Sequence, residues 1–318
     1  MVIRVTRILL TMQLLAAAGI YLLLVHSAGM GSHLLAAGLA IAIVLLVRMA
    51  ITANNFGLSW IYRSETPHDH RLGWSAAARL FLLEYCASMI SSSWTMGFCT
   101  FDDRPVAAGP APVLLVHGYG CNSGYWRFMS RALSRAGIGH YGIDLEPMLA
   151  GIDQFVPALH NRIEDICRQT GQEQLVIVAH SMGGLVARAY LRDHGARRIL
   201  RVITLGTPHR GTGLARFGAG QNVREMLWSG SAENGRCSAW LDGLARREDP
   251  LLRPLFISLY SHQDNIVSPQ LSSHLPGACN IEFNGIGHVA LGLHPRVHRE
   301  VIAAIRSAAA TGLPQPSG

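Results

Sequence analysis

The sequence predicts an α/β domain with a mostly parallel central sheet, helices on both faces of that sheet, and N-terminal transmembrane helices in front of it. After residue 112, short apolar and β-branched runs alternate with helix-like segments. One of these runs ends in a tight turn rich in serine and glycine, and the turn leads into a helix. Two long apolar stretches before residue 54 predict the membrane helices.

The first apolar stretch covers residues 8–26 and is almost continuous. At about 1.5 Å rise per residue it is long enough to cross a hydrocarbon core of about 30 Å. The second stretch reaches spanning length only if it extends through Arg48 to about residue 53, which requires the arginine to snorkel to the headgroups near the helix end. We expect two transmembrane helices, about 8–26 and 34–53, that form a membrane anchor over residues 1–53.

The arginines around the two stretches predict an orientation. Arg4 and Arg7 precede the first stretch, Arg48, Arg63 and Arg71 follow the start of the second, and the link between the two stretches has no lysine or arginine. The positive-inside rule then places both ends, and the domain that follows, on the cytoplasmic side of the inner cell membrane. Alternatively, the first stretch is a cleaved signal peptide and the domain is periplasmic or secreted. The second apolar stretch argues against this alternative.

Residues 54–110 are expected to form a linker between the anchor and the α/β domain. Within it, residues 74–90 mix apolar and charged side chains, which fits either an amphipathic helix in the membrane interface or a helix packed on the domain. Residues 101–112 are typical of an edge strand and a connecting segment. The domain itself is expected to cover 111–311, and residues 312–318 are expected to be a flexible tail.

Composition excludes some partners and cofactors. All 27 basic residues are arginine, and the net charge is +7. This charge fits an anionic membrane surface, whereas no basic stripe interleaved with aromatic residues predicts nucleic-acid binding. The six cysteines include no C-x-x-C pair and no cluster at zinc spacing, so the sequence indicates no metal site. Cys237 and Cys279 could pair in an oxidising compartment, whereas a cytoplasmic domain would keep buried free thiols.

The serine-rich turn provides a candidate nucleophile. Residues 175–178 form an apolar strand pattern, residues 179–184 read Ala-His-Ser-Met-Gly-Gly, and a helix pattern follows. A strand–serine turn–helix unit lifts the hydroxyl of Ser181 clear of the sheet. The residues two before and two after the serine must be small, and they are Ala179 and Gly183. An ordinary turn has a similar composition, so this interpretation depends on the order of the other catalytic groups.

A glycine-rich loop follows the earlier strand pattern at residues 112–116. It reads His117-Gly118-Tyr119-Gly120, and such a loop leaves backbone amides free to bind a developing oxyanion. The predicted oxyanion donors are the amides of Tyr119 and of Met182, which follows the serine. His117 and Gly118, together with Ala179, His180 and Gly183, are expected to support the loop and the turn.

Two later strand patterns, 255–260 and 279–283, are each followed by a residue with catalytic chemistry. Asp264 follows the first and His288 the second, so the chain order is serine, acid, histidine. A serine is a weak nucleophile until an imidazole accepts its proton, and a carboxylate fixes the tautomer of that imidazole. We therefore predict Ser181, Asp264 and His288 as catalytic residues.

Other residues compete for these two roles. His294 and His298 lie at the start of the last helix pattern rather than in a loop after a strand. Asp242 and Asp249 lie in a polar insertion with no strand before them. A further aspartate precedes the serine, which is the wrong order for the acid, and we interpret Asp144 as a structural or pocket-wall residue.

Three motifs, at residues 116–120, 179–184 and 205–212, carry a family resemblance. From about Pro112 to Ala310 the chain resembles bacterial lipases and esterases of the α/β-hydrolase superfamily. Ala179 replaces the commoner glycine but looks like the variant found in small Bacillus-type lipases. The resemblance implies the α/β-hydrolase fold and triacylglycerol-lipase-like hydrolysis of carboxylic esters through an acyl-enzyme, without a cofactor. It also suggests that residues 213–250 form a small cap over the acyl pocket, the alternative being an insertion with an ordinary packed face.

Together these features predict a membrane-anchored serine hydrolase that acts on an acyl ester or lipid at the bilayer. An acyltransferase or thioesterase with the same three residues is the nearest alternative. A catalytically inactive membrane binding or transport component is the alternative from another class. Acyl length, alcohol group and oligomeric state are not predicted.

Overall fold

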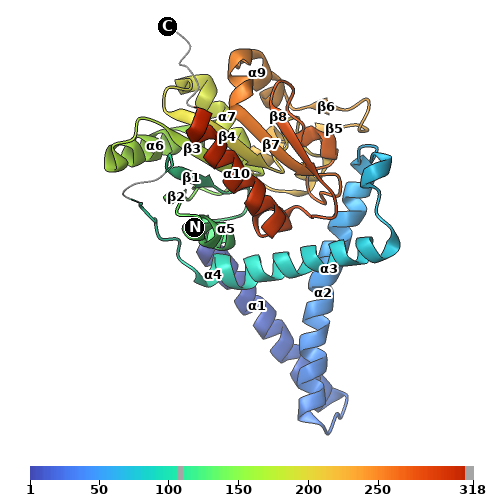
Figure 1. The fold of residues 1–318 in the computed structure, drawn as a ribbon. Coiled ribbons are helices and arrows are strands. Elements are labelled where there is room, and N and C mark those ends of the chain that lie inside the picture. The colour runs from blue at the N-terminus through green and yellow to red at the C-terminus, as the bar shows by residue number, and fades with distance from the viewer. Residues whose placement is uncertain (107–109, 312–318) are drawn as a thin grey trace.

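The computed structural model describes residues 1–106 and 110–311. It consists of an N-terminal helical hairpin and an α/β domain (Figure 1). The predicted flexible tail, 312–318, lies outside the described residues, as do residues 107–109 of the predicted linker.

The domain is built on a six-stranded sheet in the order β2-β1-β3-β4-β7-β8. Every neighbouring pair in it is parallel, which confirms the predicted fold class. The strands of this sheet are β1 (Val113–Val116), β2 (His140–Ile143), β3 (Leu175–His180), β4 (Ile199–Leu205), β7 (Phe256–Ser261) and β8 (Cys279–Phe283). A separate antiparallel pair joins β5 (Trp228–Ser229) to β6 (Arg236–Cys237).

Helices cover both faces of the sheet because alternate strand residues point to opposite sides. In β1, Leu114 and Val116 join a core cluster with α6, α7 and α9, whereas Val113 and Leu115 join a cluster with α5 and α10. The domain helices are α5 (Arg127–Arg135), α6 (Val156–Thr170), α7 (Met182–His194), α8 (Gln221–Glu225), α9 (Ala239–Arg247) and α10 (Pro295–Thr311).

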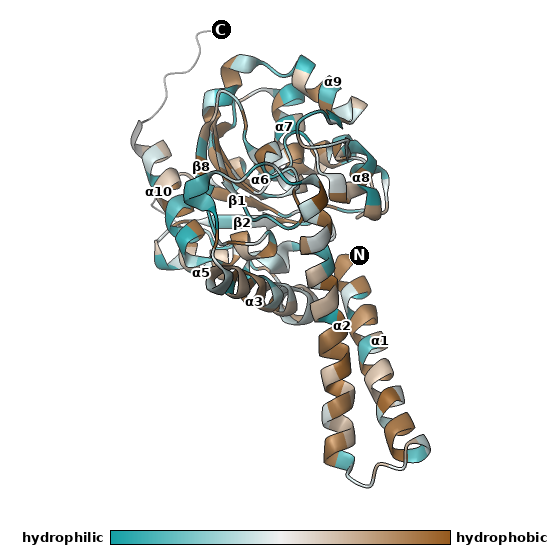
Figure 2. Cartoon of the chain, turned by 90° about the vertical axis from the view of Figure 1, so that its right-hand side faces the viewer, coloured by the Kyte–Doolittle hydropathy of each residue, from teal (hydrophilic) through white to brown (hydrophobic). Residues whose placement is uncertain are grey.

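The hairpin consists of α1 (Val2–Leu22), which continues as a π-helical turn to Ser27, and α2 (His33–Tyr62). Both helices are long and apolar enough to cross a membrane, and at most 11% of the most apolar window of either is buried. Figure 2 shows hydrophobic residues along both helices and the hairpin projecting away from the domain. Length, composition and exposure therefore make α1 and α2 candidate membrane spans.

The second helix differs from the prediction in its length and in the place of Arg48. It runs to Tyr62 rather than to residue 53, because its last turns pack on the domain, where Ser59 and Tyr62 are buried. Arg48 therefore lies mid-helix and does not snorkel past a helix end. Its guanidinium donates to Gln13 at 3.2 Å and to Ser93 at 2.6 Å instead.

The predicted linker contains α3 (Trp74–Ile90), a π-helical turn (Ser91–Thr95) and α4 (Met96–Phe98). Leu80, Glu84 and Ala87 of α3 are buried, and the helix crosses the base of the domain where the hairpin begins (Figure 1). These contacts favour the second interpretation of this segment, a helix packed on the domain. The expected edge strand is reduced, in the described part of 101–112, to one antiparallel bridge between Arg104 and His140.

The segment 213–250 packs some of its apolar side chains on the domain. Met226, Trp228 and Leu241 are buried, and Met226 and Leu241 join the same core cluster as α7. These three apolar residues therefore face the domain, and a cap over the acyl pocket remains a prediction. Cys237 and Cys279 match neither expectation. They are not bridged, because all six cysteines are free thiols, and Cys279 is exposed rather than buried.

Candidate active site

Ser181 lies at the sharp turn between β3 and α7. Its backbone has φ 54° and ψ −126°, and it is the one non-glycine residue in the described chain with a positive φ. Such a conformation costs about 1–3 kcal/mol for an L-residue and is retained where the surrounding structure enforces it. The turn therefore holds the serine in the strained geometry that a nucleophile elbow requires.

Close backbone approach explains the small residues around this turn. A Cβ atom on Gly183 would lie 2.6 Å from the carbonyl oxygens of both His117 and Val116, and one on Gly118 would lie 2.8 Å from the Cβ of Ser181. Ala179, two residues before the serine, is fully buried in the sheet. The elbow and the glycine-rich loop can thus pack together only because these positions are small.

The structure brings the three predicted catalytic side chains into one hydrogen-bonded chain. Nε2 of His288 lies 3.1 Å from Oγ of Ser181, and Nδ1 of His288 lies 2.7 Å from Oδ2 of Asp264. The three residues follow β3, β7 and β8, so they meet at the carboxyl edge of the parallel sheet, where ligands of such sheets bind. All three are nearly buried, and Ser181 is 8% exposed.

Two backbone amides fix the position of the Asp264 carboxylate. Oδ1 of Asp264 accepts the amides of Ile266 at 2.8 Å and Val267 at 2.7 Å, which leaves Oδ2 for His288. Gly206, in the motif after β4, makes room for this pair. Its φ is +56°, and a Cβ there would lie 3.1 Å from Oδ2 of Asp264 and 3.2 Å from Nδ1 of His288.

Burial and charge act in opposite directions on His288. Burial alone would lower the pKa of its imidazole, but the charge and the hydrogen bond of Asp264 outweigh burial and place the pKa above its usual value. A raised pKa stabilises the imidazolium that forms when the ring accepts a proton from serine. The ring acts as a base only in the pH range above this raised pKa.

The two predicted oxyanion donors are free to bind a ligand. Within the described chain, the backbone amides of Tyr119 and Met182 donate to no acceptor. Met182 is the first residue of α7, so its amide lies at the positive end of the helix dipole. Both amides remain predicted oxyanion donors.

His117 and His180 support the site as neutral rings. Nε2 of His117 accepts the amide of Leu145 at 3.0 Å, so Nδ1 carries the proton and donates to the Gly118 carbonyl at 2.9 Å. Nε2 of His180 donates to the His288 carbonyl at 3.1 Å. Burial lowers the pKa of both rings. They therefore position the loops around the serine and carry no charge into the site.

The competing residues are bound elsewhere. His298 bonds to the Gly292 carbonyl at 2.9 Å, and Asp242 pairs with Arg246 at 2.8 Å. Asp249 accepts the amide of Leu251 at 2.9 Å as a helix cap. The two others have local partners as well, since His294 accepts the Arg296 amide at 3.2 Å and Asp144 accepts the Ser123 amide at 2.6 Å.

Sequence reasoning missed one buried carboxylate beside the site. Glu84 of α3 accepts the amides of Val289 at 2.9 Å and Ala290 at 3.0 Å, directly after His288. Burial raises the pKa of Glu84, while the nearby His288 favours its charged form. Glu84 thus fixes the histidine loop from the linker helix. In the sequence, the only indication of this role is a lone glutamate in an apolar helix.

Replacing Glu84 with glutamine is expected to change the pH dependence of activity. The negative charge of Glu84 raises the pKa of His288, so its removal lowers that pKa and moves the acidic limb of kcat/KM to lower pH. Stability falls by about 1–3 kcal/mol, because the amide supplies one acceptor where the carboxylate supplied two. The measurement is a pH–rate profile with urea unfolding. Glu65→Gln, at an exposed site, is the control, and an unchanged limb would contradict the assignment.

The side chain of Tyr119 fastens the start of the 213–250 segment to the glycine-rich loop. Its hydroxyl donates to the carbonyl of Ala219 at 2.9 Å and accepts the amide of the same residue at 3.2 Å. Arg216 lies in the same exposed stretch, next to exposed Phe217. Two hydrogen bonds at one hydroxyl thus hold residues 216–220 beside the site.

Tyr119→Phe is expected to loosen this stretch and to leave the backbone amide of residue 119 in place. Each lost hydrogen bond contributes about 0.5–1.5 kcal/mol, so trypsin should cleave after Arg216 several times faster than in the native chain. Mass spectrometry of a digestion time course measures this. Tyr85→Phe, which loses one hydrogen bond to Leu45 far from the segment, is the control. Equal cleavage in all three proteins would contradict the role of the hydroxyl.

Comparison with known proteins identifies the fold. Residues 111–226 match the family model described as alpha/beta hydrolase fold. The domain has the α/β-hydrolase fold. The matched region of the domain contains β1 to β4 with the glycine-rich loop and the turn of Ser181, and Asp264 and His288 lie beyond it.

Solved structures with a similar fold include lipases. The mature form of a Bacillus licheniformis lipase is 17% identical, with a TM-score of 0.52, over 63% of this chain and 95% of that chain. Its propeptide form is 19% identical, with a TM-score of 0.53, over 63% of this chain and 53% of that chain. Lipase B of Aspergillus fumigatus is 16% identical, with a TM-score of 0.50, over 66% of this chain and 59% of that chain. At these identities the similarity establishes the hydrolase fold.

Proposed function

We propose that the protein is a membrane-anchored serine hydrolase that cleaves carboxylic esters through an acyl-enzyme. The observation that carries the proposal is the hydrogen-bonded chain from Ser181 through His288 to Asp264 at the carboxyl edge of the sheet. A hydroxyl, an imidazole and a carboxylate in this arrangement have the geometry of an activated nucleophile. The lipase structures of similar fold agree with this chemistry.

In the proposed mechanism, Oγ of Ser181 attacks the ester carbonyl carbon while Nε2 of His288 accepts the serine proton. The amides of Tyr119 and Met182 bind the oxyanion, and the loss of one such donor typically costs about 2.7–4 kcal/mol of barrier. His288 then gives the proton to the leaving alkoxide, which departs as an alcohol. In the second half, His288 takes a proton from water, the hydroxide attacks the acyl-enzyme, and the acid leaves as the serine regains its proton.

The contacts of α2 support a substrate from the bilayer. The hydroxyl of Ser268 donates to the carbonyl of Ser59 at 2.7 Å, and the amide of Leu271 donates to Oγ of Ser64 at 3.0 Å. These contacts attach the end of the candidate span to the segment that follows Asp264. An enzyme held with its acid loop against a membrane helix is placed to take apolar esters from lipid.

A cavity between the hairpin and the domain supports the same substrate class. It has a volume of about 910 Å³, lies between α2, α3 and the loop of Asp264, and includes the aromatic rings of Phe56, Trp60 and Phe81 in its lining. Most of its other lining residues are polar or charged, and Asp264 is one of them, so the cavity offers both apolar rings and polar groups to a ligand. We infer that lipid esters are the physiological substrates.

A comparison of donors and acceptors tests the proposed reaction. Full-length protein in detergent is given p-nitrophenyl esters of short and long acyl chains and thioesters of the same acids, with and without added alcohols and thiols. Free acid should be the main product, and the long-chain ester should be cleaved faster in mixed micelles. A main product formed by transfer to the alcohol or thiol would favour an acyltransferase, a preference for thioesters a thioesterase, and the absence of turnover an inactive membrane component.

We also propose that the domain faces the cytoplasm. In the structure the N-terminus lies on the domain side of the hairpin, so Arg4 and Arg7 share a side with the domain (Figure 2). Alkaline phosphatase, which is active only outside the cytoplasm, should be active when fused at Gly31 in the hairpin turn and inactive when fused after the domain. The opposite pattern would place the domain in the periplasm.

A further inference from the structure

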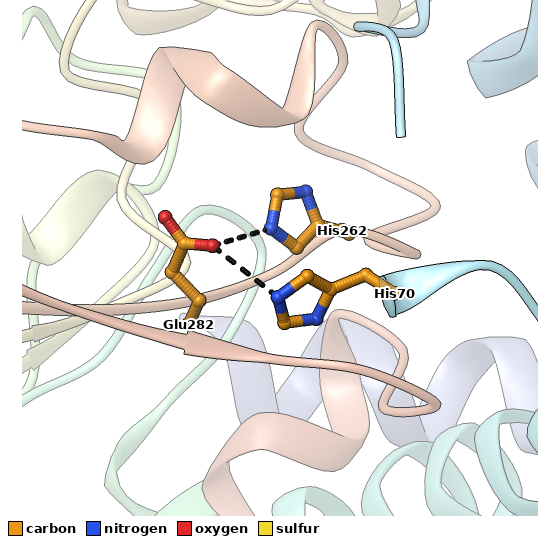
Figure 3. A group of neighbouring side chains, drawn as sticks. All are labelled: His70, His262 and Glu282. Carbon is orange, nitrogen blue, oxygen red and sulfur yellow. Dashed lines mark hydrogen bonds and ion pairs between the residues drawn. The ribbon is translucent and has the colours of Figure 1, made fainter. Parts of the chain in front are cut away.

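A second group of side chains with ligand chemistry lies outside the hydrogen-bonded chain of the serine. It consists of His70, His262 and Glu282 (Figure 3). His70 belongs to the short 3-10 helix His68–His70 between α2 and α3, His262 follows β7, and Glu282 lies in β8. Three separate parts of the chain therefore meet at this cluster. One of its members, His262, lies two residues before Asp264 in the sequence.

The spacing of the three side chains fits one small metal ion. Oε2 of Glu282 lies 2.8 Å from Nε2 of His262 and 3.5 Å from Nε2 of His70. Bonds of about 2.0–2.1 Å in a tetrahedral zinc site place the ligand atoms about 3.3 Å apart. The two separations lie on either side of that value, so small rotations of the side chains bring them to it.

The imidazole of His70 has no hydrogen bond to any described residue. Its Nδ1 is buried without a partner, and its Nε2 is 3.5 Å from the carboxylate, which is too long for a hydrogen bond. The ring lies against that of His262, with centroids 4.4 Å apart. A mostly buried imidazole without a hydrogen-bond partner, in contact with a second imidazole whose plane is tilted by 38°, indicates a ligand that satisfies it.

The carboxylate is already oriented for this role. The hydroxyl of Tyr260 donates to Oε1 of Glu282 at 2.7 Å and leaves Oε2 directed at the two imidazoles. Groups of this kind, which bind the far oxygen of a ligating carboxylate, orient it and raise metal affinity. The cluster therefore has two nitrogen ligands, one oxygen ligand and a supporting hydrogen bond.

We propose that His70, His262 and Glu282 bind one Zn²⁺ ion, with water as the fourth ligand. Two imidazoles and one carboxylate suit zinc, whereas Mg²⁺ and Ca²⁺ prefer oxygen ligands. The ion joins the segment between α2 and α3 to the loop of Asp264, where Gln263 already donates to the His70 carbonyl at 2.8 Å. Its role is to stabilise the contact between the membrane-side segment and the acid loop.

Metal titration of the full chain tests this proposal. Chelator-treated protein in detergent is titrated with ZnCl₂ by calorimetry and with Co²⁺ by visible absorption, which is strong for tetrahedral sites. We expect one equivalent of each ion to bind, and excess Zn²⁺ to raise the unfolding temperature because it binds the folded state. His70→Ala and Glu282→Gln should each weaken zinc binding at least about tenfold.

His68→Ala is the matched control, because His68 lies in the same 3-10 helix but is exposed. It should bind zinc as the native chain does. Circular dichroism establishes that each variant is folded, and this readout does not require the metal. Absence of a stoichiometric site, equal binding by Mg²⁺, or undiminished binding by folded His70→Ala and Glu282→Gln would overturn the proposal.

Discussion

Ser181→Ala is expected to lower kcat for ester hydrolysis by about 10⁶-fold, as removal of a nucleophilic serine does in other hydrolases. Without Oγ there is no acyl-enzyme, and only binding and the oxyanion amides can still accelerate attack by water. The residual rate should show no initial burst of product. Stopped-flow release of p-nitrophenol, for native and variant protein at equal concentration, measures both quantities.

The control for this prediction is Ser75→Ala, at an exposed serine of α3. It should retain the native rate within a factor of two. Because alanine and serine have nearly the same backbone preferences, Ser181→Ala keeps the strained turn, and its fold can be checked by unfolding temperature. A variant that is folded and keeps more than a tenth of the native rate would exclude Ser181 as the nucleophile.

Asp264→Asn is expected to lower kcat by about 10⁴-fold. The asparagine oxygen can still accept the amides of Ile266 and Val267, which now bind Oδ1. The NH₂ group then faces Nδ1 of His288, so the proton of the neutral imidazole moves to Nε2. A protonated Nε2 can no longer accept the proton of Ser181. The loss should appear in kcat at every pH between 7 and 9, and KM should change little.

Asp249→Asn provides the comparison for the acid. Asp249 was a competing candidate in the sequence and caps a 3-10 helix in the structure through Leu251. Asparagine is an equally good cap, so kcat should stay within a factor of two of the native value and the unfolding temperature should not change. If Asp249→Asn were the more damaging substitution, the acid would be misassigned.

Local patterns in the sequence were sufficient for the sheet and for most of the candidate site. The apolar and β-branched runs predicted β1, β3, β7 and β8, and their ends shifted by at most a few residues, as for β7, which covers 256–261 rather than 255–260. Ser181, Asp264 and His288 were predicted because parallel strands bring their carboxyl ends to one edge. Which of these residues lie next to one another follows from the order of the strands in the sheet. A parallel strand order can be predicted from a single sequence.

Features that depend on packing between distant segments were not predictable. Glu84 and the cluster of His70, His262 and Glu282 follow no recognisable sequence motif. Glu84 comes from α3 and His70 from a short 3-10 helix, and both contact loops of the domain that are far away in the sequence. The sequence predicted the end of α2 at about residue 53, before its true end at Tyr62, for the same reason. Burial of Tyr62 against the domain extends the helix beyond the apolar stretch.

The position of Arg48 illustrates how a tertiary contact changes an expectation about the membrane. From sequence alone, an arginine after an apolar stretch is expected to reach the headgroups. In the structure its guanidinium donates to Gln13 and to Ser93, so its hydrogen-bond donors have partners inside the protein. Ser93 of the linker, which provides this contact, is far from Arg48 in the chain and gave no indication of its role.

The most direct test of the central proposal is covalent labelling of the nucleophile. Native full-length protein is treated with a fluorophosphonate, digested with trypsin and analysed by tandem mass spectrometry. We expect one adduct per chain, on Ser181 within the tryptic peptide 169–188, and loss of that adduct in His288→Ala, which removes the base. Folded native protein that takes no label, or that is labelled on a different serine, would contradict it.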